Sequence, residues 1–437
     1  MTDVRKIVHE LLAQLGSSRE AQQYLKEFSG TNQARFAVVK VGGGILRDHL
    51  DELTSALAFL HRLGLIPVVL HGAGPQLDQA LADAGIETQR RDGLSVTDES
   101  VMSVARPLMY KENLRLVEAL EERGIRARGI QHGVFLCDYL DQENLGFVGH
   151  VKEVELNAVE SAVRSGAVPV LTCLGESPSG QVLNINADIA TRELVWKLQP
   201  HKIIFLSPTG GLLDRQDRII SAVSLTNDYD ALMQQPWVHS GMRLKLQQIN
   251  EMLQQLPDNT SVSITSAANL TRELFTYRGA GTLVRKGEAI NVYETPDTET
   301  LSAVKALVEQ SFHRTLRDDW FEQLDKPLVL LSETHRAAAV MVMGVNGLPY
   351  LDKFVVTSEA QGEGLGAAIW QVVRARYPAL YWRSRNTNPV TPWYFQQADS
   401  SNRSGQWVVF TIGVEDAAQR ELCLEDSLAR DSGWVAA

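Results

Sequence analysis

Cysteine, long apolar runs and positive charge are all scarce in this sequence. The three cysteines are far apart and show no CxxC spacing: Cys137, Cys173 and Cys423. This usage argues against a disulfide framework and is typical of buried, reduced thiols in the cytoplasm. No apolar run approaches the roughly 20 residues that cross a bilayer, and the acidic start of the chain is unlike a signal peptide. We therefore expect a cytoplasmic protein without a membrane segment.

The charge balance is acidic, because 42 basic and 53 acidic side chains give a net charge of −11. Such a balance offers no electrostatic basis for wrapping a nucleic acid. A few Lys and Arg side chains in one cleft can still bind a small anion. The length of 437 residues and the hydrophobic share of 44% predict two or three folded domains.

Several common catalytic motifs are absent as well. The sequence has no GxxxxGK[ST] nucleotide loop, no GxSxG elbow and no HExxH motif. Phosphate binding by a P-loop, serine hydrolysis on an elbow and zinc hydrolysis therefore have no motif to support them. We expect structural roles for the ten histidines and predict no metal site.

The hydrophobic pattern divides the chain into an arm and two domains. A helical stripe over residues 1–30 predicts an arm that either contacts a second copy or packs on its own domain. Strand-like and helical runs alternate over residues 31–287, which predicts a three-layer α/β domain with a mostly parallel sheet. Six of the eight tryptophans lie beyond residue 299, and short strands around one helix predict an α+β domain over residues 288–437.

Two glycine-rich loops follow predicted strands of the first domain, Lys40–Gly44 and His71–Pro75. Glycine lets backbone N–H groups approach phosphate oxygens, and the helix that follows adds partial positive charge. Either loop alone is weak evidence, because a glycine cluster after a strand is more often just a tight turn. Three further segments join them: 184–188 (NINAD), 209–214 (TGGLLD) and 240–245 (SGMRLK). With these five segments, residues 31–285 resemble the amino-acid kinase family, and within it the acetylglutamate kinases.

This resemblance implies that MgATP phosphorylates the side-chain carboxylate of N-acetylglutamate. Lys40 and Lys245 would stabilise the transferring phosphoryl group, and Asp188 would orient the two lysines. A carboxylate nucleophile is already ionised at neutral pH, so no general base is needed. The resemblance also implies substrate-binding and nucleotide-binding residues. The substrate-binding residues would be Gly72, Ala73, Gly74, Ser95 and Asn184. The nucleotide-binding residues would be Gly42, Gly43, Gly44, Thr209, Gly210 and Asp214.

One position departs from the family pattern. Where the family has GLRVT, this sequence has Gly93, Leu94, Ser95, Val96 and Thr97. The missing arginine would pair with the α-carboxylate of acetylglutamate, a bond worth roughly 1.5–3 kcal/mol. Arg90, Arg91 and Arg106 are the candidates to replace it.

A third glycine-rich segment, 361–366 (QGEGLG), lies between a strand and a helix of the second domain. It lacks the acidic residue about 20 positions later that a dinucleotide fold needs. It resembles instead the pyrophosphate loop of GNAT acetyltransferases, where a helix N-terminus receives the diphosphate of coenzyme A. Its neighbours are similar to the acetyltransferase domain of vertebrate-like acetylglutamate synthases: 350–354 (YLDKF), 382–385 (WRSR), 388–389 (NP) and 392–395 (PWYF).

This second resemblance implies acetyl transfer from acetyl-CoA to the α-amine of L-glutamate. Lys353, Arg383 and Arg385 suit a dicarboxylate, because guanidinium groups pair with carboxylates in a bidentate way. Asn388 would hold the amine or a polar end of glutamate. Tyr394, or Tyr350 as second candidate, would supply a proton or orient the groups; Tyr394 is also compatible with a core position. The cofactor would contact Phe354, Val355, Val356, Gln361, Gly362, Gly364 and Gly366.

Arginine is expected to regulate such an enzyme. The arm with Tyr24, together with Glu273, Gly279 and Gly281, resembles the arginine site of arginine-sensitive kinases, although a terminal helix and a turn explain the same residues equally well. We expect a homo-oligomer, a tetramer or a hexamer. Two alternatives stay open: a synthase whose kinase domain is only a scaffold and arginine sensor, and a noncatalytic arginine-binding regulator.

Overall fold

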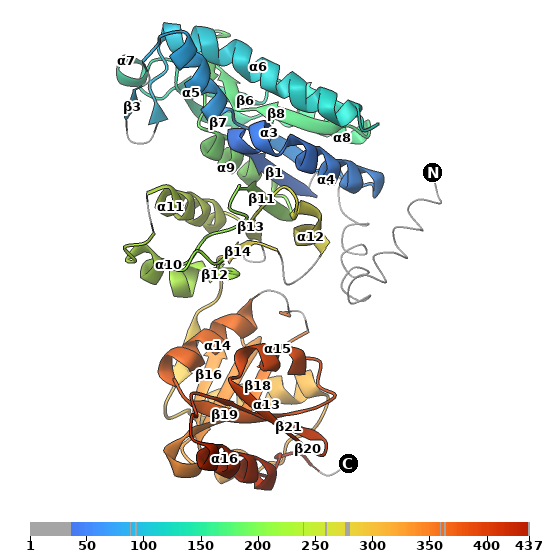
Figure 1. Cartoon of the computed structure of the whole chain (residues 1–437), viewed down its shortest axis with the longest axis vertical. Coiled ribbons are helices and arrows are strands. Elements are labelled where there is room, and N and C mark those ends of the chain that lie inside the picture. Colours follow the sequence, from blue (N-terminus) through green and yellow to red (C-terminus); the bar gives the residue numbers. More distant parts are fainter. Residues whose placement is uncertain are drawn as a thin grey trace. The chain divides into compact units, whose positions relative to one another are not determined.

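The computed structural model describes residues 36–87, 89–91, 94–238, 240–257, 260–275, 280–358, 360–361 and 364–435. The chain divides into two compact units, with the boundary between Lys286 and Gly287 (Figure 1). The predicted arm, including Tyr24, lies outside the described residues, as do Gly93, Gly279 and Gly362.

The first unit is built on an eight-stranded sheet in the order β12-β14-β13-β11-β1-β2-β8-β5. Its neighbouring strands are parallel except for the antiparallel pair of β13 and β14. The predicted mostly parallel sheet is therefore confirmed. The strands are β1 (Ala37–Val41), β2 (Val68–His71), β5 (Ala127–Ile130), β8 (Val168–Thr172), β11 (Lys202–Leu206), β12 (Ala222–Ser224), β13 (Ser261–Thr265) and β14 (Thr282–Arg285).

Helices cover both faces of this sheet, which explains why its central strands are apolar along their whole length. Val39 and Val41 of β1 pack toward α4 and α6, whereas Val38 packs toward α9 and α11. The helices are α3 (Gly43–Asp48), α4 (Leu50–Arg62), α5 (Gly74–Asp83), α6 (Glu99–Glu121), α8 (Asn157–Arg164), α9 (Ala187–Leu198), α10 (Leu225–Met233), α11 (Ser240–Gln254) and α12 (Leu270–Phe275).

A smaller sheet and a hairpin flank the main sheet of the first unit. The small sheet has the order β10-β9-β6-β7, and the hairpin joins β3 to β4. Their bounds are β3 (Arg90–Arg91), β4 (Leu94–Ser95), β6 (Phe135–Tyr139), β7 (Gly149–Val154), β9 (Leu174–Glu176) and β10 (Val182–Asn184), with α7 (Gln142–Leu145) between β6 and β7.

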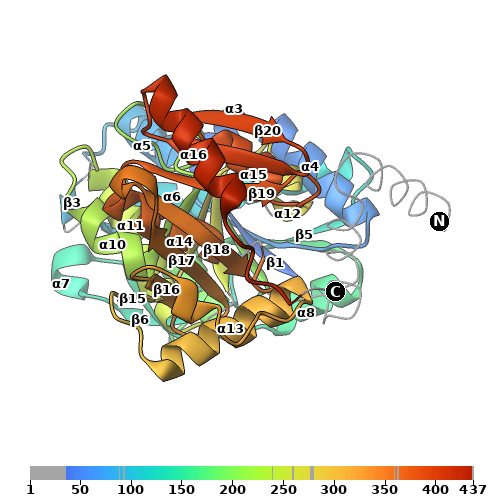
Figure 2. The same cartoon turned by 90° about the horizontal axis from the view of Figure 1, so that it is seen from below.

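The second unit holds a seven-stranded sheet in the order β15-β16-β17-β18-β19-β21-β20. Only β18 and β19 pair in parallel among these described strands. Figure 2 shows β16, β17 and β18 side by side. The strands are β15 (Ile290–Tyr293), β16 (Leu328–Ser332), β17 (Ala337–Met343), β18 (Pro349–Val356), β19 (Leu380–Arg385), β20 (Ser400–Ser404) and β21 (Trp407–Ile412).

The helices of the second unit lie on both faces of its sheet, which confirms the predicted α+β architecture. α14 packs on the face that carries Leu351 and Trp382, and α13 packs on the face that carries Val340 and Val355. The helices are α13 (Thr298–Phe312), α14 (Leu365–Arg376), α15 (Thr391–Gln397) and α16 (Ala417–Ala429), with short 3-10 turns η2 (Phe321–Gln323) and η3 (Val345–Gly347).

The central pair of strands in the second unit separates along its length. β18 and β19 pair only at Tyr350 with Tyr381 and at Leu351 with Trp382. Both strands continue beyond these pairs, to Val356 and to Arg385. The sheet therefore opens between the carboxyl ends of β18 and β19, where backbone groups are left free to meet a ligand.

Candidate active sites

The two glycine loops of the first unit meet at the carboxyl ends of neighbouring strands. β1 and β2 are parallel with Val41 opposite His71, and Gly72 donates its N–H to the carbonyl of Val41 at 3.0 Å. α3 begins at Gly43 and α5 begins at Gly74. Parallel strands bring such loops to one edge of a sheet, where open α/β folds bind ligands.

Gln76, which the sequence analysis missed, ties the two loops together. Its Nε2 donates to the carbonyl of Gly43 at 2.9 Å. A Cβ on Gly43 would lie 2.5 Å from the Gln76 Oε1 and 2.8 Å from Pro75, so this close approach requires glycine. The only signal for Gln76 in the sequence is that an amide side chain stands two positions into the helix that follows a glycine loop.

Three charged side chains converge beside these loops. The Lys40 ammonium, on β1, lies 2.6 Å from Asp188 Oδ1, in the first turn of α9. Lys245, on α11, is close enough to both for their charges to act on it. Burial lowers the pKa of Lys245, the Lys40 charge lowers it further, and Asp188 opposes the change. The structure thus brings together the three residues to which the sequence analysis gave phosphoryl-transfer roles.

Asn184 lies between this cluster and the β3–β4 hairpin. Its Nδ2 donates to the Thr97 hydroxyl at 3.1 Å, and that hydroxyl donates to the carbonyl of Ser95 at 3.2 Å. Gly72 approaches the start of α9, because a Cβ added there would lie 3.1 Å from the Cβ of Ala187. Ala73 is the N-cap residue of α5. Asn184 is thus linked to Ser95 through Thr97, while Gly72 lies against the start of α9 and Ala73 lies at the start of α5.

The hairpin register distinguishes two of the three candidate replacement arginines, and the third, Arg106, lies on α6. Arg90 lies directly opposite Ser95, and Arg91 lies opposite Leu94. Directly opposed residues share a face of an antiparallel pair. Arg91 donates to Asn144 Oδ1 at 2.9 Å, and Arg106 is exposed on α6. Arg90 is therefore the arginine that projects from the face of Ser95.

The candidate nucleotide segment follows β11, the strand on the other side of β1. Thr209 donates its hydroxyl to the carbonyl of Gly211 at 2.8 Å, and Gly210 has a φ of +72°. Asp214 accepts the backbone N–H of Arg218 at 2.9 Å, and this bond, with others from its own turn, holds the pKa of Asp214 low. Asp214 thus stabilises the turn that shapes this edge of the site.

The candidate arginine-binding residues divide between described and undescribed positions. Glu273 is buried on α12 and accepts the N–H of Ala280 at 2.6 Å. A Cβ on Gly281 would lie 2.0 Å from the carbonyl oxygen of Ile264, so glycine is required there by packing. Tyr24 and Gly279 lie outside the described residues.

In the second unit, a β-bulge places two charges on one side of β18. The register of β17 and β18 shifts so that Lys353 pairs with Val340 while Leu351 pairs with Met341, which leaves Asp352 as the extra residue. A bulge re-aims side chains in this way. The Lys353 ammonium lies 2.7 Å from Asp352 Oδ2, and both side chains are 7% exposed.

Two indole rings, both missed by the sequence analysis, complete this pair. Trp320 donates its Nε1 to Asp352 Oδ2 at 3.2 Å. The Lys353 ammonium lies 4.8 Å from the ring centre of Trp320 and 5.8 Å from that of Trp434. An ammonium over an indole face is stabilised by the ring quadrupole.

The two candidate arginines of β19 lie beside Trp407. The guanidinium carbon of Arg383 lies 4.4 Å from the ring centre of Trp407, and that of Arg385 lies 5.4 Å from it. Arg383 also donates to the carbonyls of Ser427 and Arg430, at 2.5 and 2.8 Å. Arg385 is exposed, so it has more freedom than Arg383 to meet a ligand.

The two candidate tyrosines lie on opposite faces of the sheet. Tyr394 packs on the α14 face among Trp370, Trp382 and Phe410. Tyr350 packs on the other face, with the Arg430 guanidinium 4.3 Å from its ring centre. Burial raises the pKa of both phenols. The Asn388 side-chain oxygen accepts the N–H of Val390 at 3.2 Å, near the start of α15.

The third glycine-rich segment lies at the open end of β18. Gly364 has a φ of +86° and is the N-cap residue of α14, a conformation that favours glycine. A Cβ on Gly366 would lie 3.3 Å from the Val356 side chain, and Gln361 donates to the carbonyl of Val356 at 3.5 Å. The N-terminus of α14 therefore faces the end of the strand segment that contains Phe354 and Val355.

Comparisons with protein families find a match in each of the two units. Residues 35–266 match the amino acid kinase family, and residues 289–429 match the N-acetyltransferase domain of N-acetylglutamate synthase. The chain belongs to the amino acid kinase family and carries this acetyltransferase domain after the kinase domain. Both domains belong to transferase families.

Individual relatives cover the chain almost completely. It is 48% identical to an "Acetylglutamate kinase" of Xanthomonas campestris pv. campestris, over 95% of this chain and 99% of the relative. It is 32% identical to the human "N-acetylglutamate synthase, mitochondrial", over 94% of this chain and 76% of the relative.

Solved structures share the fold. An N-acetylglutamate synthase from Neisseria gonorrhoeae, complexed with coenzyme A and N-acetyl-glutamate, covers 91% of this chain and 98% of its own, at 18% identity and a TM-score of 0.62. The same synthase with coenzyme A and L-arginine gives a TM-score of 0.57 at 17% identity, with the same coverage.

The described residues contain no helix long and apolar enough to cross a membrane. Across the same residues, no group of His, Cys, Asp and Glu side chains is arranged to hold a metal ion.

Proposed function

We propose that this chain acetylates L-glutamate with acetyl-CoA and phosphorylates N-acetyl-L-glutamate with MgATP, two steps that begin arginine synthesis. The observation that carries the proposal is the convergence of Lys40, Asp188 and Lys245 beside two glycine loops. Three distant segments supply these residues, and a fold kept only as a scaffold does not need two like charges held at partly buried positions. The relatives named above support both activities.

In the kinase reaction, the chain positions and neutralises charge. Lys40 and Lys245 spread positive charge over the transferring phosphoryl group, and Asp188 keeps the two ammonium groups from repelling one another. The N–H groups at the starts of α3 and α5 add donors for phosphate and substrate. The carboxylate of acetylglutamate attacks the γ-phosphorus, and ADP leaves; Mg²⁺ enters with ATP as part of the substrate.

Arg90 is our candidate for the guanidinium that Ser95 cannot supply. It projects from the face of Ser95, whose strand contacts Asn184 through Thr97. Its present partner, Asp78, is 3.3 Å away, and both side chains are at least half exposed. Exposed pairs of this kind are worth only about 0–1 kcal/mol, so Arg90 can exchange Asp78 for a substrate carboxylate.

In the acetyltransferase reaction, the opening between β18 and β19 would receive the thioester. The N-terminus of α14 would bind the diphosphate of the cofactor, and an N–H of Phe354, Val355 or Val356 would polarise the acetyl carbonyl. The amine nitrogen of glutamate forms the new C–N bond as the C–S bond breaks. Tyr394 packs on the α14 face, so its hydroxyl is our candidate donor of a proton to the departing thiolate.

Lys353 and the exposed Arg385 are our candidates for the two carboxylates of glutamate. Tyr350 and Arg430 lie on that same face of the sheet, away from Tyr394. This separation supports our placing the acceptor on one face and the leaving group on the other.

Two assays on the full chain test the proposal. The first measures ADP release with N-acetylglutamate, and the second measures thiol release from acetyl-CoA with glutamate. Activity in both supports it. Acetyl transfer alone supports the alternative in which the kinase domain is a scaffold, and arginine binding with neither activity supports the regulator.

Arginine regulation, oligomeric state and compartment are finer parts of the proposal. We expect arginine to bind near Glu273, and a tetramer or hexamer to form; calorimetry with Glu273→Gln and light scattering test these expectations. The cytoplasm remains our predicted compartment, because Cys137, Cys173 and Cys423 are free thiols and buried.

A further inference from the structure

A short segment, Asp431–Val435, crosses the loop that precedes η2, and we call it the strap. Trp434 forms an antiparallel bridge with Leu316. Arg317 donates its backbone N–H to Gly433, and Val435 donates to the carbonyl of Thr315, both at 2.9 Å. Backbone pairing thus holds the strap against residues 315–317, which lie 115 positions or more earlier in the sequence.

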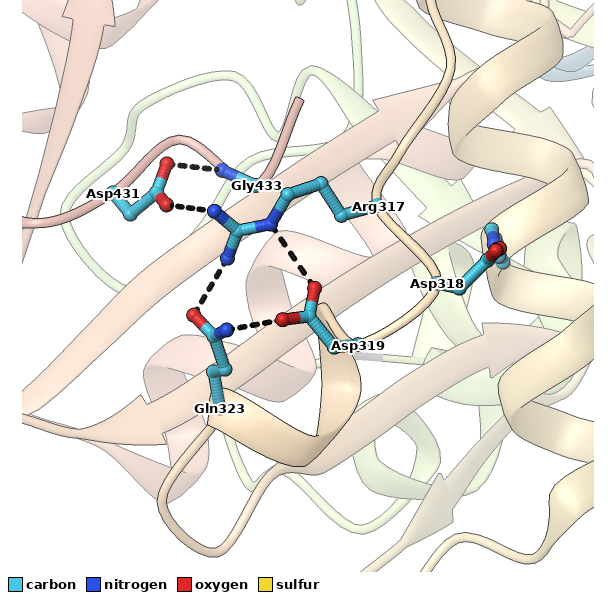
Figure 3. Close-up of polar contacts among 7 residues, drawn as sticks. Arg317, Asp318, Asp319, Gln323, Asp431 and Gly433 are labelled. Atoms are coloured by element: carbon cyan, nitrogen blue, oxygen red, sulfur yellow. Dashed lines mark hydrogen bonds and ion pairs between the residues drawn. The ribbon is translucent and has the colours of Figure 1, made fainter. Parts of the chain in front are cut away.

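One arginine side chain anchors the strap, as Figure 3 shows. Arg317 forms an ion pair with Asp431 through one nitrogen, bonds Asp319 Oδ1 at 3.0 Å through Nε and bonds Gln323 Oε1 at 2.6 Å through the third nitrogen. Asp431 also accepts the N–H of Gly433 at 3.0 Å. A single guanidinium therefore connects the strap, the loop and η2.

The strap lies directly against Trp320. Gly433 has a φ of +75°, and a Cβ there would lie 2.5 Å from the Trp320 ring. Trp320 is 3% exposed and donates to Asp352. Contacts therefore run from Arg317 through the strap and Trp320 to the bulge of β18.

The same strap carries the second indole of the lysine site. Trp434 packs against Phe312, with ring centres 5.5 Å apart, and its ring centre is 5.8 Å from the Lys353 ammonium. An ammonium has three N–H donors, and Asp352 takes one of them. In the part of the chain that the structure describes, the other donors meet no acceptor, so Lys353 is a fixed cation between the Trp320 and Trp434 rings with donors available for a ligand.

We propose that the strap positions Lys353 for the acyl acceptor, so that Arg317 and Trp434 act as positioning residues for the carboxylate of glutamate. The proposal rests on the acetyltransferase function proposed above. When the strap is released, water reaches Lys353 and Asp352, and the attraction between the ammonium and a substrate carboxylate weakens as the surroundings become more polar. The described contacts of Trp434 lie on the α13 face of the sheet, whereas α14 packs on the opposite face.

Arg317→Gln in the full chain tests the proposal by steady-state kinetics with each substrate varied. We expect the KM for glutamate to rise about 5- to 20-fold, with the KM for acetyl-CoA and the kcat within twofold of wild type. Arg317→Lys keeps one ion pair and should give an intermediate KM for glutamate. Lys305→Gln is the matched control, because Lys305 pairs with the neighbouring Asp318, outside the Arg317 network, and it should leave both KM values unchanged.

Trp434→Phe and Trp434→Ala test the proposal independently, because they alter the strap's own contact with Lys353. The smaller phenyl ring should raise the KM for glutamate less than alanine does. The proposal is overturned if Arg317→Gln and Trp434→Ala both leave that KM unchanged, or if they raise both KM values equally. A wild-type chain that does not acetylate glutamate would overturn the proposed function instead, and glutamate titration of the same variants would then decide the role of the strap.

Discussion

At the scale of single residues, Arg385 differs from Arg383 in what holds it. Arg383 is bonded to two backbone carbonyls near the end of α16, whereas Arg385 is exposed beside the same indole ring. A charge-assisted bond to a carboxylate is worth about 1.5–3 kcal/mol, which corresponds to roughly 10- to 100-fold in affinity.

Arg385→Ala should therefore raise the KM for glutamate at least about 10-fold and change the KM for acetyl-CoA little. Initial rates with each substrate varied check this. Arg403→Ala, at an exposed arginine of β20, is the control and should behave as wild type. Equal rises in the two KM values for Arg385→Ala would refute the assignment.

His71 is the residue whose protonation should matter most for stability. It is fully buried, and this burial lowers its pKa to about 4. Asn113 donates to its Nε2 at 3.2 Å and to the Val170 carbonyl at 2.9 Å, so the ring is neutral with its proton on Nδ1. In the unfolded chain its pKa returns to about 6.5.

The stability that the neutral His71 ring provides is therefore fully present above pH 6.5 and is lost as the pH falls from 6.5 toward 4. Over this range the contribution of His71 to the free energy of unfolding should change by up to about 1.4 kcal/mol per pH unit. His71→Gln, whose Oε1 can still accept from Asn113, should flatten the dependence in urea unfolding. His150→Gln, at an exposed ring, should leave the pH dependence unchanged. If His71→Gln kept the wild-type dependence of unfolding free energy on pH, this explanation would be wrong.

At the scale of elements, the glycine loops owe their conformations to close contacts between α3 and α5. Gly42 and Gly43 are adjacent in sequence but differ in their surroundings. A Cβ on Gly42 meets nothing within 4 Å, whereas one on Gly43 meets Gln76 and Pro75 within 3 Å.

Gly43→Ala should lower the free energy of unfolding by about 1–3 kcal/mol, because an inserted methyl group must displace its neighbours. Gly42→Ala is the matched control and should change it by less than about 0.5 kcal/mol. Chemical denaturation of both variants compares them. Equal stability would show that the two helices can separate without cost.

The sequence predicted these elements well and their cross-connections poorly. Apolar runs and glycine loops indicated the parallel sheet and the helix starts, since both are local patterns. Gln76, Trp320 and Trp434 escaped notice because each acts through a contact distant in sequence. The β3–β4 register, which separates Arg90 from Arg91, also depends on pairing that no local pattern reveals.

At the scale of the whole molecule, the candidate residues of the two reactions lie in separate units. Lys40, Asp188 and Lys245 precede the boundary at Lys286, and Lys353, Arg385 and Tyr394 follow it. Each unit has hydrophobic clusters of its own.

Lys245→Ala should abolish ATP turnover with N-acetylglutamate, because it removes one of the two cations at the phosphoryl group, and should leave acetyl transfer within twofold. Coupled assays of both reactions on one preparation measure this. Lys197→Ala, at an exposed lysine of α9, should leave both rates unchanged. A parallel loss of both activities in Lys245→Ala would mean that the sites depend on each other.

The divergence of β18 from β19 has a consequence for hydrogen exchange. A cofactor with amide groups spaced along a flexible arm can fill the gap as a substitute strand, hydrogen-bonding to backbone that otherwise faces water. The amides at the wide end of the gap should then exchange with deuterium slowly when the cofactor is bound and quickly when it is not, while Tyr350 and Leu351, at the paired end, stay protected in both states.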